Sequence, residues 1–410
     1  MSDLVTTVLL MGTCDTKFEE LLFIKAQICK HGVKANLMDV GRSAIAQKEI
    51  EISRSDFLDQ NMSSLNRGEI AKAMIAAATP FVKRLHQRNK IAGVISLGGS
   101  WGTSIGSAIM RSALPVGFPK LIVSTVASGS VSNFVGQTDI TMMNSVVDIA
   151  GLNSILDPTL TNAAAMIAGA AKAFVSREAP STHNSVASRK RVAITMFGVT
   201  TPAADAARAV LTNEGYEVLV FHATGNGGRA MENLIREGRI DGVLDLTTTE
   251  LADELVGGIM SAGPDRLTAA GQAGIPQVVS LGALDMVNFG PRSTLPDKFN
   301  DRNIYEHNPD ITIIRTTVQE CRVLGDQIGK KLKAAKRPDR VRVFVPLGGL
   351  SMLGVEGGLY HDASADKALF GALQESLHGT EIEVIKDGRA INDDGFAAEM
   401  AKALIEFTKR

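Results

Sequence analysis

The stretch Val94-Ile95-Ser96-Leu97-Gly98-Gly99-Ser100-Trp101-Gly102-Thr103-Ser104-Ile105-Gly106 decides the fold of this chain. Its aliphatic run ends at a glycine pair, and a hydroxyl-rich turn then leads into an apolar, helix-like segment. This pattern predicts a strand, a glycine turn and the start of a helix. In such a turn backbone N–H groups and the helix dipole face an anion, and glycine lets the anion approach closely. The predicted phosphate- or carboxylate-binding residues are Gly98, Gly99, Ser100, Gly102, Thr103 and Ser104.

The turn does not match the common phosphate-binding fingerprints. It is not closed by Gly-Lys-Ser/Thr as in a Walker A loop, and it is not Gly-x-Gly-x-x-Gly. The alternative interpretation is a tight strand-to-helix connection whose glycines only allow close packing. Because glycines and hydroxyls coincide here, anion binding is the favoured interpretation, but the pattern does not identify the ligand.

The composition is that of an ordinary soluble globular protein, with 45% hydrophobic and 21% charged residues. A length of 410 residues favours two domains. A net charge of −1 and 5% aromatic residues argue against a nucleic-acid partner. We expect a cytoplasmic protein without a signal peptide or membrane contact, since the longest apolar stretch, residues 163–175, reads as a buried helix. The three cysteines and seven histidines lack metal-binding spacing, so no metal site is predicted.

Strand-like and helix-like segments alternate along the chain, which predicts an α/β fold with mostly parallel sheets. The expected strands of the first half are residues 5–11, 34–40, 91–97 and 120–125, and the expected helices are residues 18–30 and 69–87. The polar stretch 176–190 is the candidate linker. The predicted domains are therefore residues 1–180 and residues 190–410.

Landmarks of the first half recur in the second half in the same order. The run ending at Gly12 is echoed by the run ending at Gly198, and Gly117-Phe118-Pro119 is echoed by Gly274-Ile275-Pro276. We therefore predict two Rossmann-like lobes, the first with a helical insertion at residues 43–66 and the second with an extension at residues 288–410. Because such folds bind ligands beyond the carboxyl ends of their strands, the cleft between the lobes is the expected site.

Polar residues follow the other predicted strands of the first lobe. Thr13 and Asp15 either contact the ligand or cap the next helix. Lys17 opposes the dipole of that helix, which an anion nearby would explain, and Asp39 occupies the usual position of a ribose-binding carboxylate. A second hydroxyl-rich turn follows residue 124. The cofactor-binding prediction therefore also includes Gly12, Thr13, Asp15, Lys17, Asp39, Thr125, Ala127, Ser128 and Gly129.

The second lobe is expected to orient the substrate and to carry the chemistry. A glycine-rich turn predicts a second anion site with an arginine beside it, and residues 288–309 read as a lid. The predicted substrate-binding residues are Gly227, Gly228, Arg229, Asn288 and Arg292. The predicted catalytic residues are Glu250, Asp285 and His307. His222 and His361 are further acid–base candidates, for which a structural or solvent-exposed role is the favoured alternative. Alternatively, Glu250 caps a helix and the lid segment is a dimer contact.

Five ordered motifs together resemble one family over essentially the whole chain. They lie at residues 11–17, 97–100 with 102–103, 124–129, 280–291 and 346–349. The chain resembles the ATP-binding domain family named for the N-terminal half of the tomato mosaic virus resistance protein. The resemblance implies two Rossmann-like lobes, ATP binding and a homodimer. Trp101 stands where that family usually has another glycine, which predicts that its indole stacks on the ligand.

Three functions follow as hypotheses. The leading one is a cytosolic ATP-binding protein that acts as an enzyme on a small metabolite, with ATP held by the glycine and hydroxyl loops, with or without magnesium. The second is an enzyme that holds an anionic or phosphorylated sugar acid in the same loops without ATP. The third is a non-catalytic binding or regulatory protein that responds to a nucleotide.

Overall fold

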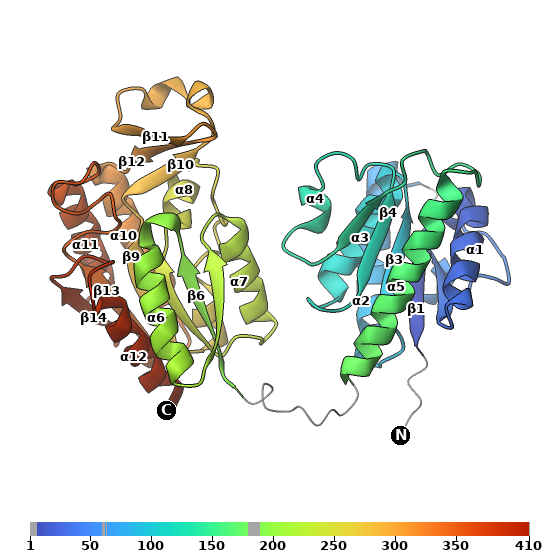
Figure 1. Ribbon diagram of the computed structural model, residues 1–410, viewed down its shortest axis with the longest axis horizontal. Helices are drawn as coiled ribbons and strands as arrows, with labels where there is room; N and C mark the ends of the chain where they lie inside the picture. The colour runs from blue at the N-terminus through green and yellow to red at the C-terminus, as the bar shows by residue number, and fades with distance from the viewer. Residues whose placement is uncertain (1–5, 60–61, 63, 179–188, 410) are drawn as a thin grey trace. The chain divides into compact units, whose positions relative to one another are not determined.

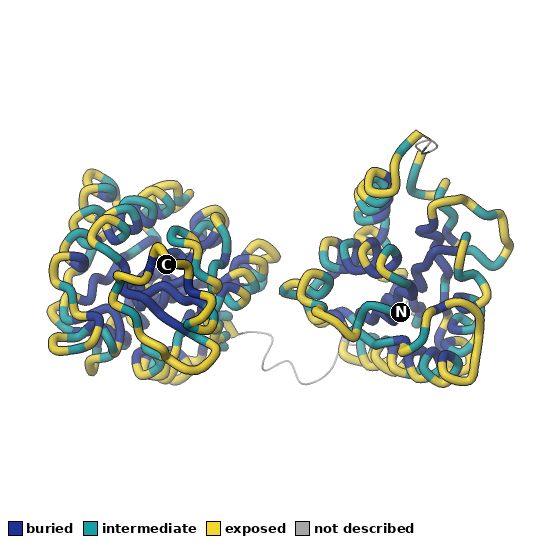
Figure 2. Tube along the Cα trace, turned by 90° about the horizontal axis from the view of Figure 1, so that it is seen from above, coloured by how far each residue is buried: buried dark blue, intermediate teal, exposed yellow. Residues whose placement is uncertain are grey.

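The computed structural model describes residues 6–59, 62, 64–178 and 189–409. The chain divides into two compact units, Met1–His183 (unit 1) and Asn184–Arg410 (unit 2) (Figure 1). In each unit a buried sheet lies inside a shell of more exposed helices (Figure 2). The predicted α/β fold with two mostly parallel sheets is confirmed.

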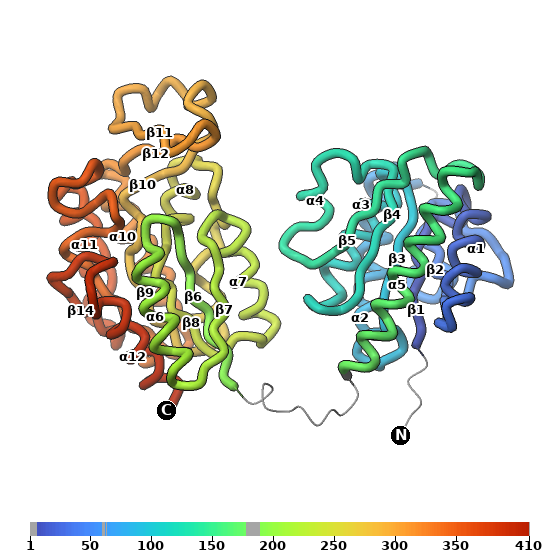
Figure 3. Tube along the Cα trace, viewed as in Figure 1, coloured from blue at the N-terminus to red at the C-terminus, as the bar shows by residue number. Residues whose placement is uncertain are grey.

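Unit 1 is built on a five-stranded parallel sheet of order β2-β1-β3-β4-β5 (Figure 3). Its three central strands, β1, β3 and β4, are buried along their whole length, as expected for a parallel sheet covered by helices on both faces. The elements are β1 (Thr7–Gly12), α1 (Cys14–Lys30), β2 (Lys34–Asp39), the 3₁₀ turn η1 (Arg54–Asp56), α2 (Arg67–Gln87), β3 (Gly93–Gly98), α3 (Ser100–Ala113), β4 (Lys120–Ser124), α4 (Ser132–Val135), β5 (Thr141–Asn144) and α5 (Leu156–Glu178).

Alternate residues of the unit 1 strands face two separate cores. Val8 and Leu10 of β1 pack with α1 and α5 on one face. Leu9 and Met11 pack with α2 and α3 on the other face. This period of two follows from the pleat of the strand, and it makes unit 1 a doubly wound sheet.

Unit 2 has a six-stranded parallel sheet of order β14-β13-β9-β8-β6-β7 and a small antiparallel sheet of order β10-β12-β11. Helices α6 and α12 cover one face of the large sheet, and α7 to α11 lie on the other. The strands and helices up to the small sheet are β6 (Arg191–Met196), α6 (Thr201–Asn213), β7 (Glu217–His222), α7 (Asn226–Arg236), β8 (Gly242–Thr247), α8 (Glu250–Val256), α9 (Ala269–Ala273) and β9 (Gln277–Gly282). The remaining ones are β10 (Met286–Phe289), β11 (Ile304–Asn308), β12 (Ile311–Arg315), α10 (Val318–Lys333), β13 (Val341–Pro346), α11 (Ala363–Leu377), β14 (Glu383–Asp387) and α12 (Phe396–Lys409). Short 3₁₀ turns are η2 (Gly198–Thr200), η3 (Arg292–Thr294), η4 (Asp297–Phe299) and η5 (Pro338–Arg340).

The two large sheets repeat one strand order. Strands β2-β1-β3-β4 of unit 1 correspond to β7-β6-β8-β9 of unit 2. The turn after β8 therefore occupies the place that the glycine turn after β3 has in unit 1. Two Rossmann-like lobes are confirmed.

Two local predictions, at residues 43–66 and 288–309, need correction, and the predicted linker lies mostly outside the described residues. Residues 43–66 contain no α-helix within their described part, only η1 and a bridge between Ile52 and Met38. Of the predicted linker, residues 176–178 end α5, and residues 179–188 lie outside the described residues, as does Val5 of the first predicted strand. The predicted lid at residues 288–309 is not a plain loop, because β11 pairs with β12 in the small sheet. No helix in the described parts of the chain is long and apolar enough to span a membrane.

Candidate functional site

The strand order of unit 1 reverses between β1 and β3. The chain passes from β1 outward to β2, and from β3 outward through β4 to β5 on the other side. In doubly wound folds the ligand crevice lies beyond the carboxyl ends of the strands at such a reversal. The segments that meet there are the turns after β1 and β3, with the turn after β4 next to them.

The N-terminus of α3 is the strongest anion-binding feature of this edge. Gly99 is the N-cap residue, and no described side chain caps the helix. The first N–H groups of an α-helix have no partner within the helix, and Thr103 is the first residue whose N–H bonds back, at 2.9 Å to the carbonyl of Gly99. The N–H groups of Ser100, Trp101 and Gly102 can therefore face an anion together with the helix dipole.

The glycines of this turn have two different roles. A Cβ on Gly98 would lie 2.9 Å from Cα of Gly102, and one on Gly102 would lie 3.2 Å from the carbonyl oxygen of Leu97. These two glycines let α3 pack closely on β3, as the alternative interpretation proposed. Gly99 has φ −77° and ψ −161°, and the nearest atom to its added Cβ is Oγ1 of Thr125 at 3.5 Å. Gly99 is therefore the glycine that leaves space in front of the helix.

The hydroxyl groups of the turn also fall into two kinds, one that is buried and paired within the protein and others that are accessible to a ligand. The Thr103 side chain is fully buried, and its hydroxyl lies 2.6 Å from that of Ser124, so it joins α3 to β4 and is not offered to a ligand. Ser100 and Ser104 are exposed on α3. Thr125 is half-buried beside Gly99. The remaining predicted residues of the turn after β4, Ala127, Ser128 and Gly129, are half-buried or exposed.

The two carboxylates near β1 join loops together. Asp39 is 1% exposed, and its Oδ1 accepts the N–H groups of Cys14 at 3.1 Å and Gly41 at 2.8 Å. Burial raises the pKa of Asp39, and burial with the nearby Asp39 raises the pKa of the Cys14 thiol. Asp15 accepts the N–H groups of Arg42 and Ser43. A ribose role for Asp39 therefore does not fit its burial, and Asp15 caps no helix.

The other predicted residues after β1 have structural partners. The Thr13 hydroxyl lies 2.9 Å from that of Thr16, and it does not cap α1. The Lys17 ammonium donates to the carbonyl oxygen of Ile149, which accounts for its place in the first turn without a bound anion. A Cβ on Gly12 would overlap the side chain of Leu21, so this glycine allows α1 to approach β1.

Trp101 is half-buried and packs against the core under α2 and α3. The guanidinium of Arg67 lies 5.2 Å from the centroid of its ring, within cation–π range. The indole Nε1 is buried without a partner among the described residues. Arg67 thus occupies one face of the ring on which a ligand was expected to stack.

In unit 2 the predicted anion site at the start of α7 is occupied by a carboxylate of the protein, that of Glu250. Glu250 is fully buried, and its Oε1 accepts the N–H groups of Gly225 at 2.7 Å and Gly228 at 3.0 Å. Its Oε2 lies 2.6 Å from Nε of Arg266, whose two Nη atoms each lie 2.6 Å from Asp245. Glu250 therefore caps α7 from inside the unit, which is the structural alternative to the catalytic prediction.

The predicted substrate contacts around α7 change accordingly. A Cβ on Gly228 would overlap the Glu250 carboxylate, and one on Gly227 would overlap the carbonyl of His222. Both glycines are explained by packing. Arg229 is exposed, with its guanidinium 3.1 Å from Oδ1 of Asn226.

Asp285 belongs to a second buried polar group. It is fully buried, and the Ser351 hydroxyl donates to its Oδ2 at 2.6 Å. Burial raises its pKa to about 6, against the opposing charge of Arg315. Arg315 in turn pairs with Asp366 at 2.6 Å. Asp285 is thus held inside the protein, away from the surface that a polar substrate would reach.

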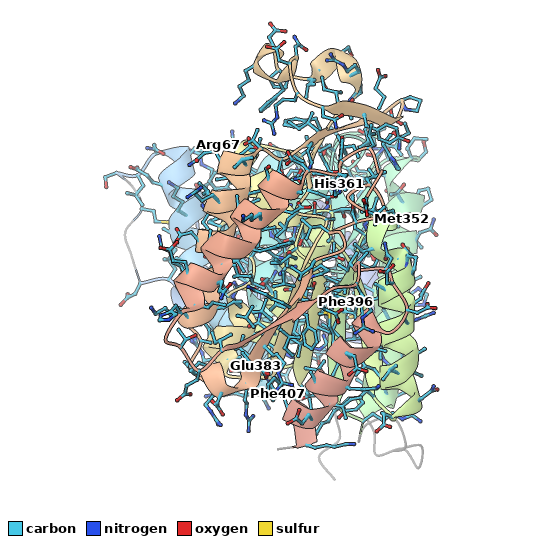
Figure 4. All side chains as sticks on the ribbon, turned by 90° about the vertical axis from the view of Figure 1, so that its left-hand side faces the viewer. Arg67, Met352, His361, Glu383, Phe396 and Phe407 are labelled. Atoms are coloured by element: carbon cyan, nitrogen blue, oxygen red, sulfur yellow. The ribbon has the colours of Figure 1, made fainter. Side chains whose placement is uncertain are left out.

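Asn288, His307 and the acid–base candidate His222 are predicted residues of unit 2 that line one small cavity at the carboxyl end of β6. Arg292 lies outside it and donates to Oδ1 of Asn300. His361 lies in the segment between β13 and α11, together with Met352 (Figure 4).

Sequence reasoning missed Arg266 and Asp253, which organise the interior of unit 2. Arg266 is fully buried although it follows Gly263-Pro264-Asp265, a typical surface turn. Asp253 lies three residues after Glu250 on α8 and carries no motif. No local signal marks either residue, because their partners come from β8 and β10.

Profiles of the two domains of the uncharacterised protein family UPF0261 match this chain. The N-terminal domain matches residues 6–176, and the C-terminal domain matches residues 189–408. The chain belongs to the UPF0261 family.

Relatives of this UPF0261 protein include both bacterial and plant chains. It is 46% identical to a UPF0261 protein of Clostridium tetani, over 98% of this chain and 99% of that protein. It is 41% identical to a UPF0261 protein of Mesorhizobium japonicum, over 96% and 97% of the two chains. The tomato ToMV resistance protein Tm-1 is 39% identical over 98% of this chain, which spans 55% of the tomato protein. The predicted sequence similarity to the tomato protein is thereby confirmed.

Similarity to solved structures is weak. A MurG from Acinetobacter baumannii is 11% identical with a TM-score of 0.25, covering 98% of this chain and 99% of its own. A UDP-N-acetylglucosamine 2-epimerase from Rickettsia bellii is 10% identical with a TM-score of 0.22, covering 62% and 77%. Similarity at this level supports no inference about substrate.

Proposed function

We propose that unit 1 of this UPF0261 protein binds ATP, with its phosphates at the N-terminus of α3. One observation carries the proposal: α3 begins uncapped beside Gly99 at the reversal of the strand order. Three N–H groups and the helix dipole would stabilise a phosphate there. The resemblance to the ATP-binding family supports a nucleotide as the source of that phosphate.

Two side chains extend this phosphate site. The hydroxyl of Ser100 is exposed on the first turn of α3, and Thr125 lies against Gly99 from the turn after β4. Hydroxyl groups can donate to phosphate oxygens alongside backbone N–H groups. We propose that the bound ATP serves a reaction on a small metabolite. Among the predicted catalytic residues, only His307 is exposed to solvent, because Glu250 and Asp285 are fully buried.

Isothermal titration calorimetry with ATP, ADP and inorganic phosphate, each with and without magnesium, tests the proposal. We expect ATP to bind more tightly than inorganic phosphate, since the ribose and base add contacts. A phosphorylated sugar acid that bound more tightly than ATP would instead favour the sugar-acid enzyme. Absence of heat with every nucleotide, at protein concentrations in the hundred-micromolar range, would contradict nucleotide binding.

We further propose that the protein is a cytoplasmic homodimer, as the family resemblance implies. Sedimentation equilibrium of the full chain should give twice the monomer mass of 43.5 kDa. A concentration-independent monomer would contradict the dimer and leave the ATP proposal untouched.

A further inference from the structure

Unit 2 contains a cavity of about 250 Å³ that shares no residue with the proposed ATP site. It opens at the carboxyl ends of β6 and β7, and strands β10 to β12 of the small sheet supply its other wall. It is lined by Phe197, Gly198, Val199, His222, Thr224, Met260, Met286, Asn288, His307, Asn308, Ile311 and Ile313.

The lining has the chemistry of a site for a flat ring. Met286 and Ile313 are buried, Phe197 and Met260 are half-buried, and none of the lining residues is an acid, a lysine or an arginine. The ring of His222 meets that of Phe197 edge-on, with centroids 5.5 Å apart. Aromatic rings favour edge-to-face partners, and methionine sulfur makes favourable contacts with ring edges. The absence of charged lining groups disfavours a charged ligand.

Among the buried side-chain polar atoms of this lining, one lacks a partner in the described parts of the chain. Asn288 is fully buried, and its Oδ1 has no hydrogen bond among the described residues. Its other groups are all engaged: the backbone N–H and Nδ2 donate to Asp253 at 3.1 and 2.9 Å, and the carbonyl oxygen accepts the N–H of Ile259 at 2.8 Å. Buried polar groups without a partner are rare and call for an explanation.

Asp253 fixes which atom of the Asn288 amide is free. Its Oδ1 also accepts the N–H of Met260 at 3.1 Å, and its Oδ2 faces Nδ2 of Asn288. An ionised carboxylate only accepts hydrogen bonds, so above the pKa of Asp253, which burial raises to about 7, the amide turns its NH₂ toward Asp253 and keeps its oxygen free. Asp253 is therefore a positioning residue for this amide.

We infer that Oδ1 of Asn288 faces this cavity, and that the cavity binds an uncharged aromatic or heteroaromatic ring whose N–H donates to this oxygen. The apolar and ring-bearing walls hold the body of the ring, and the buried oxygen selects for a donor. The exposed imidazoles of His222 and His307 border the mouth, where a substituent of the ring would meet them.

Ligand-observed NMR titration of the full chain with indole and benzofuran tests the inference. The two probes share one shape, but only indole carries an N–H donor. We expect indole to bind about tenfold more tightly than benzofuran, the effect of one hydrogen bond to a buried acceptor. Equal affinities, or no binding of indole, would overturn the inference and leave Oδ1 to an ordered water.

Two glycines allow a variant that obstructs the cavity and a matched control variant outside it. A Cβ on Gly198, which lines the cavity, would meet nothing within 4 Å, and the same holds for Gly388 outside it. Gly198→Leu should fold and weaken indole binding at least about tenfold, whereas Gly388→Leu should stay within about twofold of the wild type. Unchanged binding in Gly198→Leu would place indole elsewhere.

Asp253→Asn tests the positioning role. An amide at residue 253 can keep the two backbone bonds through its oxygen and turn its NH₂ toward Asn288, which then flips and presents Nδ2 to the cavity. We expect the preference for indole over benzofuran to disappear in this variant. A retained preference would show that Asp253 does not set the amide. ATP titration of the same variants separates this inference from the proposed function, because the substituted residues all belong to unit 2 and the proposed ATP site is built from residues of unit 1.

Discussion

The buried carboxylate Glu250 offers the sharpest test of a structural against a catalytic role. In Glu250→Gln the side-chain oxygen can still accept the N–H groups of Gly225 and Gly228, so the cap of α7 survives. The new NH₂ group, however, faces Nε of Arg266, where the carboxylate oxygen lies at 2.6 Å. Two donors then meet inside the protein, and Arg266 loses one of its anionic partners.

The expected loss follows from these contacts. A hydrogen bond between charged groups contributes about 1.5–3 kcal/mol, and a buried donor left unpaired costs about 1–3 kcal/mol. Removing one partner of a buried ion pair typically costs about 3–5 kcal/mol. Because Arg266 keeps its two bonds to Asp245, we expect the lower end, about 3 kcal/mol. For a domain of roughly 150–250 residues this lowers the melting temperature by about 6–12 °C.

Thermal unfolding of Glu250→Gln should be followed by two probes. Circular dichroism reports the whole chain, while the fluorescence of Trp101, the single tryptophan, reports unit 1 and helps to assign the loss to unit 2. Glu237→Gln is the matched control, since Glu237 is exposed and its change should stay within about 0.5 kcal/mol. A melting temperature for Glu250→Gln equal to that of the control would refute the reasoning and reopen the catalytic role.

Further predictions concern ATP binding and stability of unit 1 and the pH dependence of the free energy of unfolding. Gly99→Val should fold, because its Cβ meets only Thr125 at 3.5 Å, but it should abolish ATP binding by calorimetry; wild-type affinity would move the phosphate away from α3. Gly98→Val should instead lower the melting temperature of unit 1 in Trp101 fluorescence, since its Cβ would press on Gly102; a neutral effect would contradict the packing role. Burial raises the pKa of Asp253 to about 7 and of Asp285 to about 6, both from 3.8. The folded state therefore retains protons that the unfolded chain releases, and stability should fall as the pH rises from about 4 to about 7. Urea midpoints at pH 5 and pH 8 measure this loss, which should be smaller in Asp253→Asn; an equal loss would assign it to other groups.

The fold was largely predictable because its signals are local. The apolar run before Gly98 and the turn after it predict β3 and α3, which the structure places at residues 93–98 and 100–113. The repeat of landmarks predicted two lobes of one strand order. The segment 43–66 was misread as helical, since its charged composition does not distinguish a helix from a loop anchored by bonds such as those from Arg42 and Ser43 to Asp15.

The candidate site was only partly predictable, because side-chain partners come from distant positions. The sequence by itself determined where the strands end, and hence that Gly99, Thr125 and Asn288 follow or lie near strand ends. Only the tertiary structure decided that Glu250 is bound by Arg266, sixteen residues later, and that Asp253 orients Asn288 across thirty-five residues. The hydrophobic periodicity that predicts helices and strands depends only on residues close together in the sequence. Burial and charge pairing depend on which strands become neighbours in the sheet, and no local pattern records that choice.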